Sequence, residues 1–398
     1  MNNKISNFYN YTIIGAGASG LWMAYSLYKQ GLLNNKSLII VEEDAKKFND
    51  RTWCYWAKEE LRPHDLASKT WAYSSNSHNY SKKGSIFPYT YYHIRSQDFY
   101  QKMKLELTKC SNITWLFSSF QSHQTSNHVV VNTSDASWHS ERLFLSALSN
   151  KEEIFSTKTL KTYLNNYSNQ HILLWQSFVG WRIKTEKPVF NPSKITMMDF
   201  NIEQNGQTQF IYELPFSETE ALIEMTRFGV NKLSVTEAES ILKKYVDEKN
   251  STYQIEETEI GVIPMTTHFD SKRKALPPNE QVIYLGTIAG ALKPTTGYGF
   301  KKMAKYTQDL AVALKNNSPL PTHFRPWRFR MYDTLLLQII ATNGDRGKEI
   351  FEALFKSQPT PKILKFLDEE SDIYGEISIF SKLPISLFLK SLVKYIFK

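Results

Sequence analysis

Four residues near the N-terminus have the types and spacing that bind a dinucleotide. Gly15, Gly17 and Gly20 complete a GxGxxG pattern, and Glu42 follows 22 residues after Gly20. In such a pattern the first glycine allows a tight turn, the second lets a pyrophosphate approach the backbone, and the third lets a helix pack on a strand. An acid at that distance binds ribose hydroxyls. The spacing predicts a dinucleotide site and leaves FAD and NAD as alternatives.

A second candidate for chemistry is a carboxyl group with apolar neighbours. Glu224 lies between Ile223 and Met225 in the stretch ALIEMTRFG. Such a carboxylate is either the outward-facing polar residue of a strand or a desolvated acid, and the residues alone favour the outward-facing interpretation. For the stretch NDRTWCYW, residues 49–56, they likewise favour a polar turn before an aromatic core strand.

These residues need elements to position them. YTIIGAGASGLWMAYSLYKQG predicts a strand, a glycine turn and a helix ending near Gly31, and SLIIVEED predicts the next buried strand. Residues 96–110 and the stretch VTEAESILKKYVDEK predict helices, residues 113–215 are mostly strand-like, and the chain after residue 300 is helical. A second glycine-rich stretch, GTIAGALKPTTGYGF at 286–300, follows an apolar strand, VIYL. We expect the two glycine-rich stretches to form two sides of one cofactor cleft.

Composition narrows the function classes. The chain of 398 residues is long enough for two or more domains, and its 48 basic and 39 acidic residues give a net charge of +9. The basic residues are scattered, so no nucleic-acid partner is expected. Cys54 and Cys110 are the only cysteines, which supports neither a disulfide framework nor a cysteine-based metal site and fits a reducing cytoplasm. No metal is predicted.

The C-terminal stretch LPISLFLKSLVKYIFK has the pattern of an amphipathic, basic helix. Lys390, Lys394 and Lys398 recur every four residues, and the apolar residues fall mostly on other faces. Such a helix either lies on an anionic bilayer surface or packs on its own protein with a solvated lysine edge. No stretch reaches 18 uninterrupted apolar residues, so no bilayer-spanning helix is expected.

Taken together and in order, several motifs resemble the FAD-dependent lycopene cyclases that form β-rings on carotenoids. The motifs are GAGASGL, DRTWCYW, MMDF, YELPFSETEALIEMT, EIGVIPM, GALKPTTGYGF, FRMYDTLLL and ILKFLDEES. The resemblance implies an α/β fold of the glutathione-reductase-like flavoproteins: a Rossmann FAD-binding domain interleaved with a β-sheet substrate domain, and a C-terminal helical region. The division it implies is an FAD-binding domain of residues 1–75, 95–160 and 255–310, a substrate-binding domain of 76–94 and 161–254, and a helical region of 311–398.

The resemblance also assigns site residues. It implies Glu224 as the catalytic acid, with Glu213 and Glu259 as weaker candidates. In the motif DRTW, which follows the second predicted strand, Asp50 and Trp53 also match the lycopene cyclases. The residues expected to contact FAD are Gly15, Gly17, Ala18, Ser19, Gly20, Glu42, Arg51, Thr52, Gly286, Pro294, Thr296 and Gly297.

Two positions depart from related sequences. Met225 stands where the lycopene cyclases often have a second acid, so no role of that acid carries over. Thr287 stands where related hydroxylases usually have an aspartate, so the ribityl contact of that aspartate is absent or replaced.

By resemblance, the reaction is proton-initiated, non-redox cyclisation of the acyclic ends of lycopene, an isomerase reaction. Reduced FAD is the implied cofactor, NADPH the implied reductant, and lycopene and related acyclic carotenoids the implied substrates. We expect aromatic side chains to stabilise a carbocation, and the candidate wall residues are Trp53, Tyr55, Trp56, Tyr212 and Tyr298. The expected location is the cytoplasm, peripherally associated with the inner face of the membrane. The alternative is a flavin-dependent oxidoreductase of the same fold, either a geranylgeranyl reductase or a monooxygenase.

Overall fold

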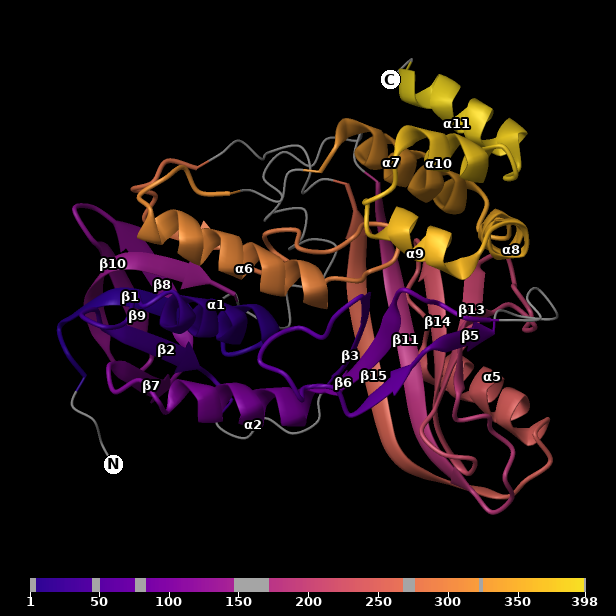
Figure 1. Ribbon diagram of the computed structural model, residues 1–398, viewed down its shortest axis with the longest axis horizontal. Coiled ribbons are helices and arrows are strands. Elements are labelled where there is room, and N and C mark those ends of the chain that lie inside the picture. Colours follow the sequence, from indigo (N-terminus) through magenta and orange to yellow (C-terminus); the bar gives the residue numbers. More distant parts are fainter. Residues whose placement is uncertain are drawn as a thin grey trace.

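The computed structural model describes residues 5–44, 51–75, 84–146, 172–267, 276–321 and 325–396. Within them the chain forms two large sheets, a small sheet between them, and a group of C-terminal helices that covers one end of the second sheet (Figure 1).

The first large sheet has seven strands in the order β7-β2-β1-β10-β9-β8, with β16 paired to β10. Its centre is parallel, because β1 pairs in parallel with β2 and β10, and β2 with β7. Strand β16 also pairs in parallel with β10, although it lies about 140 residues further along the chain. The bounds are β1 Phe8–Ile14, β2 Leu38–Glu42, β7 Ile113–Phe117, β8 Phe120–Thr125, β9 Val129–Thr133, β10 Ser137–Leu145 and β16 Val282–Tyr284.

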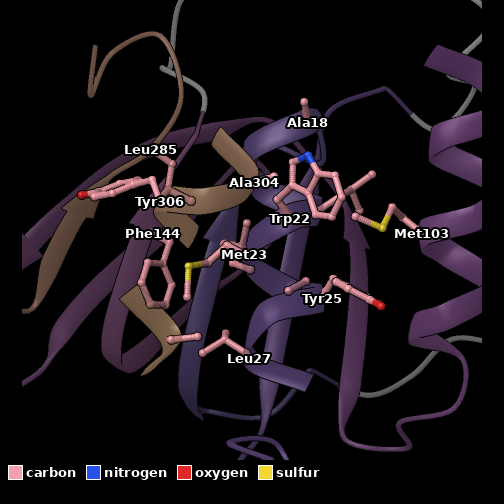
Figure 2. Close-up of a cluster of buried hydrophobic side chains, with 14 of the residues drawn as sticks. Ala18, Trp22, Met23, Tyr25, Leu27, Met103, Phe144, Leu285, Ala304 and Tyr306 are labelled. Atoms are coloured by element: carbon pink, nitrogen blue, oxygen red, sulfur yellow. The ribbon is translucent and has the colours of Figure 1, made fainter. Parts of the chain in front are cut away.

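Helices α1 (Ala18–Lys29) and α6 (Phe300–Lys315) pack against this sheet, and α2 (Ser96–Leu107) lies beside α1. Figure 2 shows their shared core, in which Trp22 and Met23 of α1 lie among side chains from the sheet and α6. Gly20 permits the close approach of α1 to β1, since a Cβ at this position would collide with the Gly15 carbonyl. The predicted strand–turn–helix–strand unit is confirmed.

The second large sheet has six strands in the order β15-β11-β14-β13-β12-β5. Side chains along each strand point alternately to the two faces of the sheet, and both faces are buried. Helix α5 (Val235–Asp247) covers one face, and the C-terminal helices pack on the other. The predicted helix VTEAESILKKYVDEK corresponds to α5, which Ser234 caps by accepting from the Glu237 N–H. The bounds are β5 Tyr73–Ser75, β11 Leu173–Thr185, β12 Lys194–Asp199, β13 Thr208–Pro215, β14 Glu220–Gly229 and β15 Tyr253–Thr266.

One predicted domain boundary differs from the strand pairing in the structure. The segment expected to return to the first domain begins at residue 255, but that position lies inside β15, which pairs with β11 along its length in the second sheet. The chain rejoins the first sheet only at β16. The strand pairing that decides this is long-range, and the local pattern of residues 253–266 carries no sign of it.

The small sheet, β3-β6-β4, explains the aromatic motif TWCYW. Its strands are β3 (Thr52–Ala57), β6 (Thr90–Arg95) and β4 (Lys69–Trp71). Successive strand side chains point to opposite faces, so Tyr55 joins the core of the first sheet while Trp56 joins the core of the second. The small sheet therefore joins both cores.

The C-terminal region is helical as predicted, and a buried ion network ties it to the second glycine-rich stretch. Lys293 Nζ lies 3.0 Å from Asp333 Oδ1 and 3.2 Å from Glu369 Oε1, and Arg325 contacts both acids. None of the described helices is long and apolar enough to cross a bilayer. The helices are α7 Trp327–Thr342, α8 Arg346–Ser357, α9 Thr360–Leu367, α10 Ile373–Phe380 and α11 Ile385–Ile396.

Removing one charge from this network should destabilise the protein strongly. Asp333→Asn removes one of the two acids that pair with the buried cations Lys293 and Arg325, and we expect a loss of about 3 kcal/mol in unfolding free energy. Urea unfolding followed by circular dichroism measures it. The control is Asp309→Asn, whose partly exposed carboxylate pairs with Lys305 on α6 and should cost less than about 0.5 kcal/mol. Equal losses for the two variants would contradict the expectation.

Candidate active site

The first glycine-rich turn presents an open helix N-terminus at the carboxyl end of β1. Gly17 precedes α1 and provides no side-chain cap, so the first N–H groups of α1 are available to an anion. A Cβ at Gly17 would meet no protein atom within 4 Å, which leaves space in front of the turn. Glu42 ends β2 beside it and accepts from the Ala16 N–H at 2.6 Å. A helix N-terminus facing open space suits a dinucleotide phosphate, and Glu42 lies where an acid could bind ribose hydroxyls.

The second glycine-rich stretch lies against the first. Gly286 adopts a φ of 65°, which favours glycine, and a Cβ there would lie 2.7 Å from Ser19 Oγ at the start of α1. Gly297, with a φ of 71°, packs against the Gln176 side chain of β11. Residues 286–297 therefore run from the first turn to the face of the second sheet. The expected adjacency of the two stretches is confirmed.

Polar atoms around this stretch support a bound cofactor. Thr296 Oγ1 and Gln176 Oε1 are buried and have no hydrogen-bond partner within the described ranges. A buried polar group without a partner costs free energy, so a ligand with donors and acceptors would stabilise both. With the open helix terminus at Gly17, these atoms fit a flavin dinucleotide spanning the two stretches.

The predicted FAD contacts fall into three places. Gly15, Gly17, Ala18, Ser19, Gly20, Glu42 and Gly286 gather at the carboxyl ends of the parallel strands, and Pro294, Thr296 and Gly297 lie on the connecting stretch. Arg51 has an exposed side chain, and its backbone N–H donates to Ser96 Oγ. Thr52 hydrogen-bonds to Glu259. Asp50 lies outside the described residues.

The second sheet brings two carboxyl groups together over a glycine. Gly180 of β11 pairs with Glu224 of β14 on one side and with Glu259 of β15 on the other. A Cβ at Gly180 would lie 2.9 Å from Glu259 Cγ, so only glycine leaves room for both acid side chains to meet above it. Glu224 and Glu259 hydrogen-bond to each other, and Thr226 Oγ1 donates to Glu224 Oε1 at 2.7 Å.

The environment of this pair favours one shared proton. Burial raises the pKa of Glu224 well above its usual value, and the charge of nearby Glu259 raises it further. Burial also raises the pKa of Glu259, while hydrogen bonds from Thr52 and Glu224 oppose that change. A hydrogen bond between the two carboxyls requires one of them to carry a proton. Because burial and the charge of Glu259 raise the pKa of Glu224 well above its usual value, the acid form of Glu224 is favoured.

Hydroxyl groups and aromatic rings surround Glu224. Tyr212 of β13 pairs directly with Glu224, and Tyr91 Oη lies 2.8 Å from Tyr298 Oη. Trp56 packs edge-on against Tyr298 with ring centroids 4.7 Å apart. Burial raises the pKa of all three tyrosines, so their hydroxyls stay neutral.

Three expected wall residues lie here and two do not. Trp56, Tyr212 and Tyr298 belong to the core on the Glu224 face, whereas Trp53 and Tyr55 pack in the core of the first sheet, beside Phe300. Strand alternation separates them, because Trp53 and Tyr55 point to the opposite face of β3 from Trp56.

Glu213 and Met225 lie on the other face of the second sheet. Glu213 pairs with Ile223 across the strands and forms an ion pair with Lys249 at 2.5 Å. Met225 is fully buried in the core beneath α5. An acid at position 225 in this chain would therefore point away from Glu224, and Glu213 is not part of the carboxyl pair.

Several residues at the site escape sequence reasoning. Gly180 lies beside the carboxyls and Tyr91 beside Cys54, and neither family motif nor spacing points to these two residues. Thr226 and Cys54 also lie beside the carboxyls; they belong to the motifs YELPFSETEALIEMT and DRTWCYW, but their sequence context assigns them no role. Gly180 carries a usable signal, since a glycine inside the strand SFVGWRI suggests a close approach by another group.

Solved structures with this fold define the class. A geranylgeranyl bacteriochlorophyll reductase-like protein from Thermoplasma acidophilum is 11% identical, with a TM-score of 0.57 over 98% of this chain and 99% of that one. A flavin-dependent brominase is 12% identical, with a TM-score of 0.57 over the same shares. A flavoprotein/dehydrogenase from Cytophaga hutchinsonii has a TM-score of 0.55 at 11% identity, over 97% and 99%. The fold is the expected α/β fold of FAD-dependent flavoproteins, with a C-terminal helical region.

Within that class, the chain belongs to the lycopene cyclase protein family, whose sequence profile matches residues 11–392. A lycopene beta-cyclase from Paracoccus sp. is 29% identical over 138 residues. That match covers 34% of this chain and spans about a third of the relative, 36% of its length.

The space at Gly17 allows a test of cofactor binding that spares the fold. Gly17→Ala places its Cβ where no atom of the described residues lies within 4 Å, so the FAD-free protein should keep its melting temperature. Gly17→Val adds further bulk at the same position. The added groups occupy the expected pyrophosphate position, and FAD affinity should fall about tenfold for Ala and further for Val. Titration by flavin fluorescence measures the affinity. Unchanged affinity in both variants would place the phosphates elsewhere.

Proposed function

We propose that the protein is a lycopene beta-cyclase, an isomerase that converts the acyclic ends of lycopene to β-rings by proton-initiated, non-redox cyclisation. The observation that carries the proposal is the partly buried carboxyl of Glu224, which meets Glu259 over Gly180 and has a pKa raised by desolvation. Family membership supports the substrate class.

Cyclisation requires two things of the protein: an acid that donates a proton and a pocket that excludes water. Glu224 donates its proton to a terminal carbon–carbon double bond of the substrate, which becomes a carbocation. A neighbouring double bond attacks that cation and closes a six-membered ring, and loss of a proton completes the β-end. An acid with an ordinary pKa would be ionised near pH 7, so the burial of Glu224 is what makes the first step available.

The aromatic side chains protect the cation. Trp56, Tyr212 and Tyr298 offer electron-rich faces that stabilise positive charge without bonding to it. The apolar core of the second sheet and the C-terminal helices keeps water from capturing the cation as an alcohol.

The two glycine-rich stretches would hold FAD between the first sheet and this face of the second. Reduced FAD would supply negative charge near the cation, and NADPH would keep it reduced without net redox turnover. The chain's own contribution is to bind the dinucleotide at Gly17 and Glu42 and to present Thr296 and Gln176 to it.

A single assay tests the proposal. Protein with FAD, NADPH and lycopene is incubated without oxygen in heavy water, and the products are analysed by mass spectrometry. We expect cyclic product with the skeleton of lycopene and one deuterium gained for each ring formed, because the initiating proton comes from an exchangeable acid. A gain of two hydrogens would indicate a reductase, and product formed only with oxygen would indicate a monooxygenase; either would overturn the cyclase proposal.

The matched variants are Glu224→Gln and Glu213→Gln. Glu224→Gln removes the acid with little change of shape, so cyclisation should fall at least a thousandfold while FAD still binds. Glu213→Gln removes a carboxyl from the opposite face, where it pairs with Lys249, and should retain most of the activity. Cyclisation by Glu224→Gln at the normal rate would place the acid elsewhere.

The proposed carotenoid substrate is insoluble in water, and the C-terminal helices offer a surface suited to the bilayer that dissolves it. Ile385, Leu389 and Val393 of α11 are each at least half exposed, and Lys390 and Lys394 lie beside them. Ile373, Tyr374 and Ile377 of α10 are exposed as well. Apolar side chains flanked by lysines suit peripheral binding to an anionic membrane. The location that we propose is the cytoplasmic face of that membrane.

Substitutions on the exposed face test membrane binding more sharply than truncation. The opposite side of α11 packs on the protein, where Ser391 Oγ donates to the Leu335 carbonyl, so deletion would disturb the core. The double variant Leu389→Ser, Val393→Ser should reduce flotation with anionic liposomes at least fivefold. Val235→Ser, an exposed apolar residue on α5, serves as the control. Equal flotation of all three proteins would exclude α11 as the contact.

A further inference from the structure

A cavity lies beside Glu259, and its described lining includes none of the aromatic residues Trp56, Tyr212 and Tyr298. It has a volume of about 360 Å³, enough for roughly ten waters, and its lining includes Thr52, His93, Arg95, Arg182, Glu257 and Glu259. Glu257 at its edge is 41% exposed, so the cavity reaches solvent. Glu259 thus has this cavity on one side and the buried acid Glu224 on the other.

Most charged groups in the cavity are already paired. Arg95 lies 2.6 Å from Glu257, and Arg182 Nε donates to Glu220 at 2.7 Å. Burial, followed by the two arginines, lowers the pKa of His93 to about 3, so its ring is neutral at physiological pH. These pairings leave Glu259 as the carboxyl that can exchange a proton between the cavity and Glu224.

Glu259 lies where it can take a proton from the cavity and pass it to Glu224. Its Oε1 is buried and accepts no hydrogen bond from any residue the structure describes. Its other contacts are with Thr52 and Glu224. The titratable groups that face it are Glu224 from β14, Cys54 from β3, His93 and Arg95 from β6, Arg182 from β11 and Glu257 from its own strand.

We propose that this cavity is the proton reservoir of the site and that Glu259 is the relay through which Glu224 is reprotonated. The proposal rests on the proposed function for its catalytic consequence. After Glu224 has given its proton to the substrate, Glu259 takes a proton from a hydronium ion or a buffer acid in the cavity water, and its O–H then transfers to the Glu224 carboxylate. The ring cation releases one proton to the solvent, so one proton is taken up and one is released per ring.

The relay separates the first turnover from later ones. Glu259→Gln keeps the size of the side chain but cannot carry a proton, whereas Glu224 already holds one before the first ring forms. In Glu259→Gln we expect each later ring to form at least tenfold more slowly than the first ring per enzyme, whereas in the wild type the first and later rings should form at similar rates. Glu256→Gln, an exposed carboxyl on the same strand, is the matched control and should turn over normally. Steady-state turnover of Glu259→Gln within twofold of the wild type would overturn the relay.

Chemical rescue distinguishes a relay from a structural role. Glu259→Ala enlarges the cavity, and formate is small enough to enter and carry a proton in place of the missing carboxyl. Added formate should raise the turnover of Glu259→Ala at least fivefold and leave Glu224→Gln inactive. Absence of rescue at saturating formate would contradict the relay.

A measurement without substrate separates this proposal from the proposed function. In the FAD-free protein, the infrared carbonyl band of the protonated carboxyl should shift on transfer to heavy water, and Glu259→Gln should slow that exchange at least tenfold. Equal exchange rates would overturn the relay, whatever the protein does to lycopene. A wild-type protein that exchanges through Glu259 but forms no cyclic product would instead overturn the proposed function alone.

Discussion

The site depends on the cost of placing a negative charge in a dry protein interior. One buried carboxyl beside another cannot ionise freely, so the pair over Gly180 holds a proton that the same groups would lose in water. The neutral tyrosine hydroxyls and the C-terminal helices packed on the sheet face preserve that condition. The hydrogen bonds from Thr226 and Thr52 act in the opposite direction, because they favour the ionised carboxyls. Acid strength here comes from the surroundings of the glutamates.

The fold brings this acid to the cofactor position through one connecting stretch. Residues 286–297 begin against Ser19, at the N-terminus of α1, and end against Gln176 on the second sheet. Lys293, within the same stretch, is anchored by Asp333 and Glu369 of the C-terminal region. A change in the helical region would therefore reach the dinucleotide turn and the sheet face together.

Proteins with this fold include a reductase-like protein and a brominase, so the fold alone does not define the chemistry. The features that favour proton transfer over redox chemistry lie in the second sheet. They are the acid on β14, the acid on β15 and the glycine between them on β11. The dinucleotide turn, by contrast, is common to the class.

The sequence by itself determined the local elements and the family. The glycine turn, the helices and the C-terminal region follow from periodicity and glycine spacing, and the ordered motifs led to the lycopene cyclases, as the family match confirms. Glu224 was a candidate only through that resemblance, since its local sequence favoured an outward-facing side chain. The tertiary structure decided the rest. It placed β15 in the second sheet, separated Trp53 from Trp56, and turned Glu213 and Met225 away from the site. It also joined Glu259 to Glu224 from strands that are not neighbours. The reason is physical: the pKa of a side chain and the identity of its contact partners depend on burial and on contacts between strands far apart in the chain. Local spacing in the sequence does not encode these.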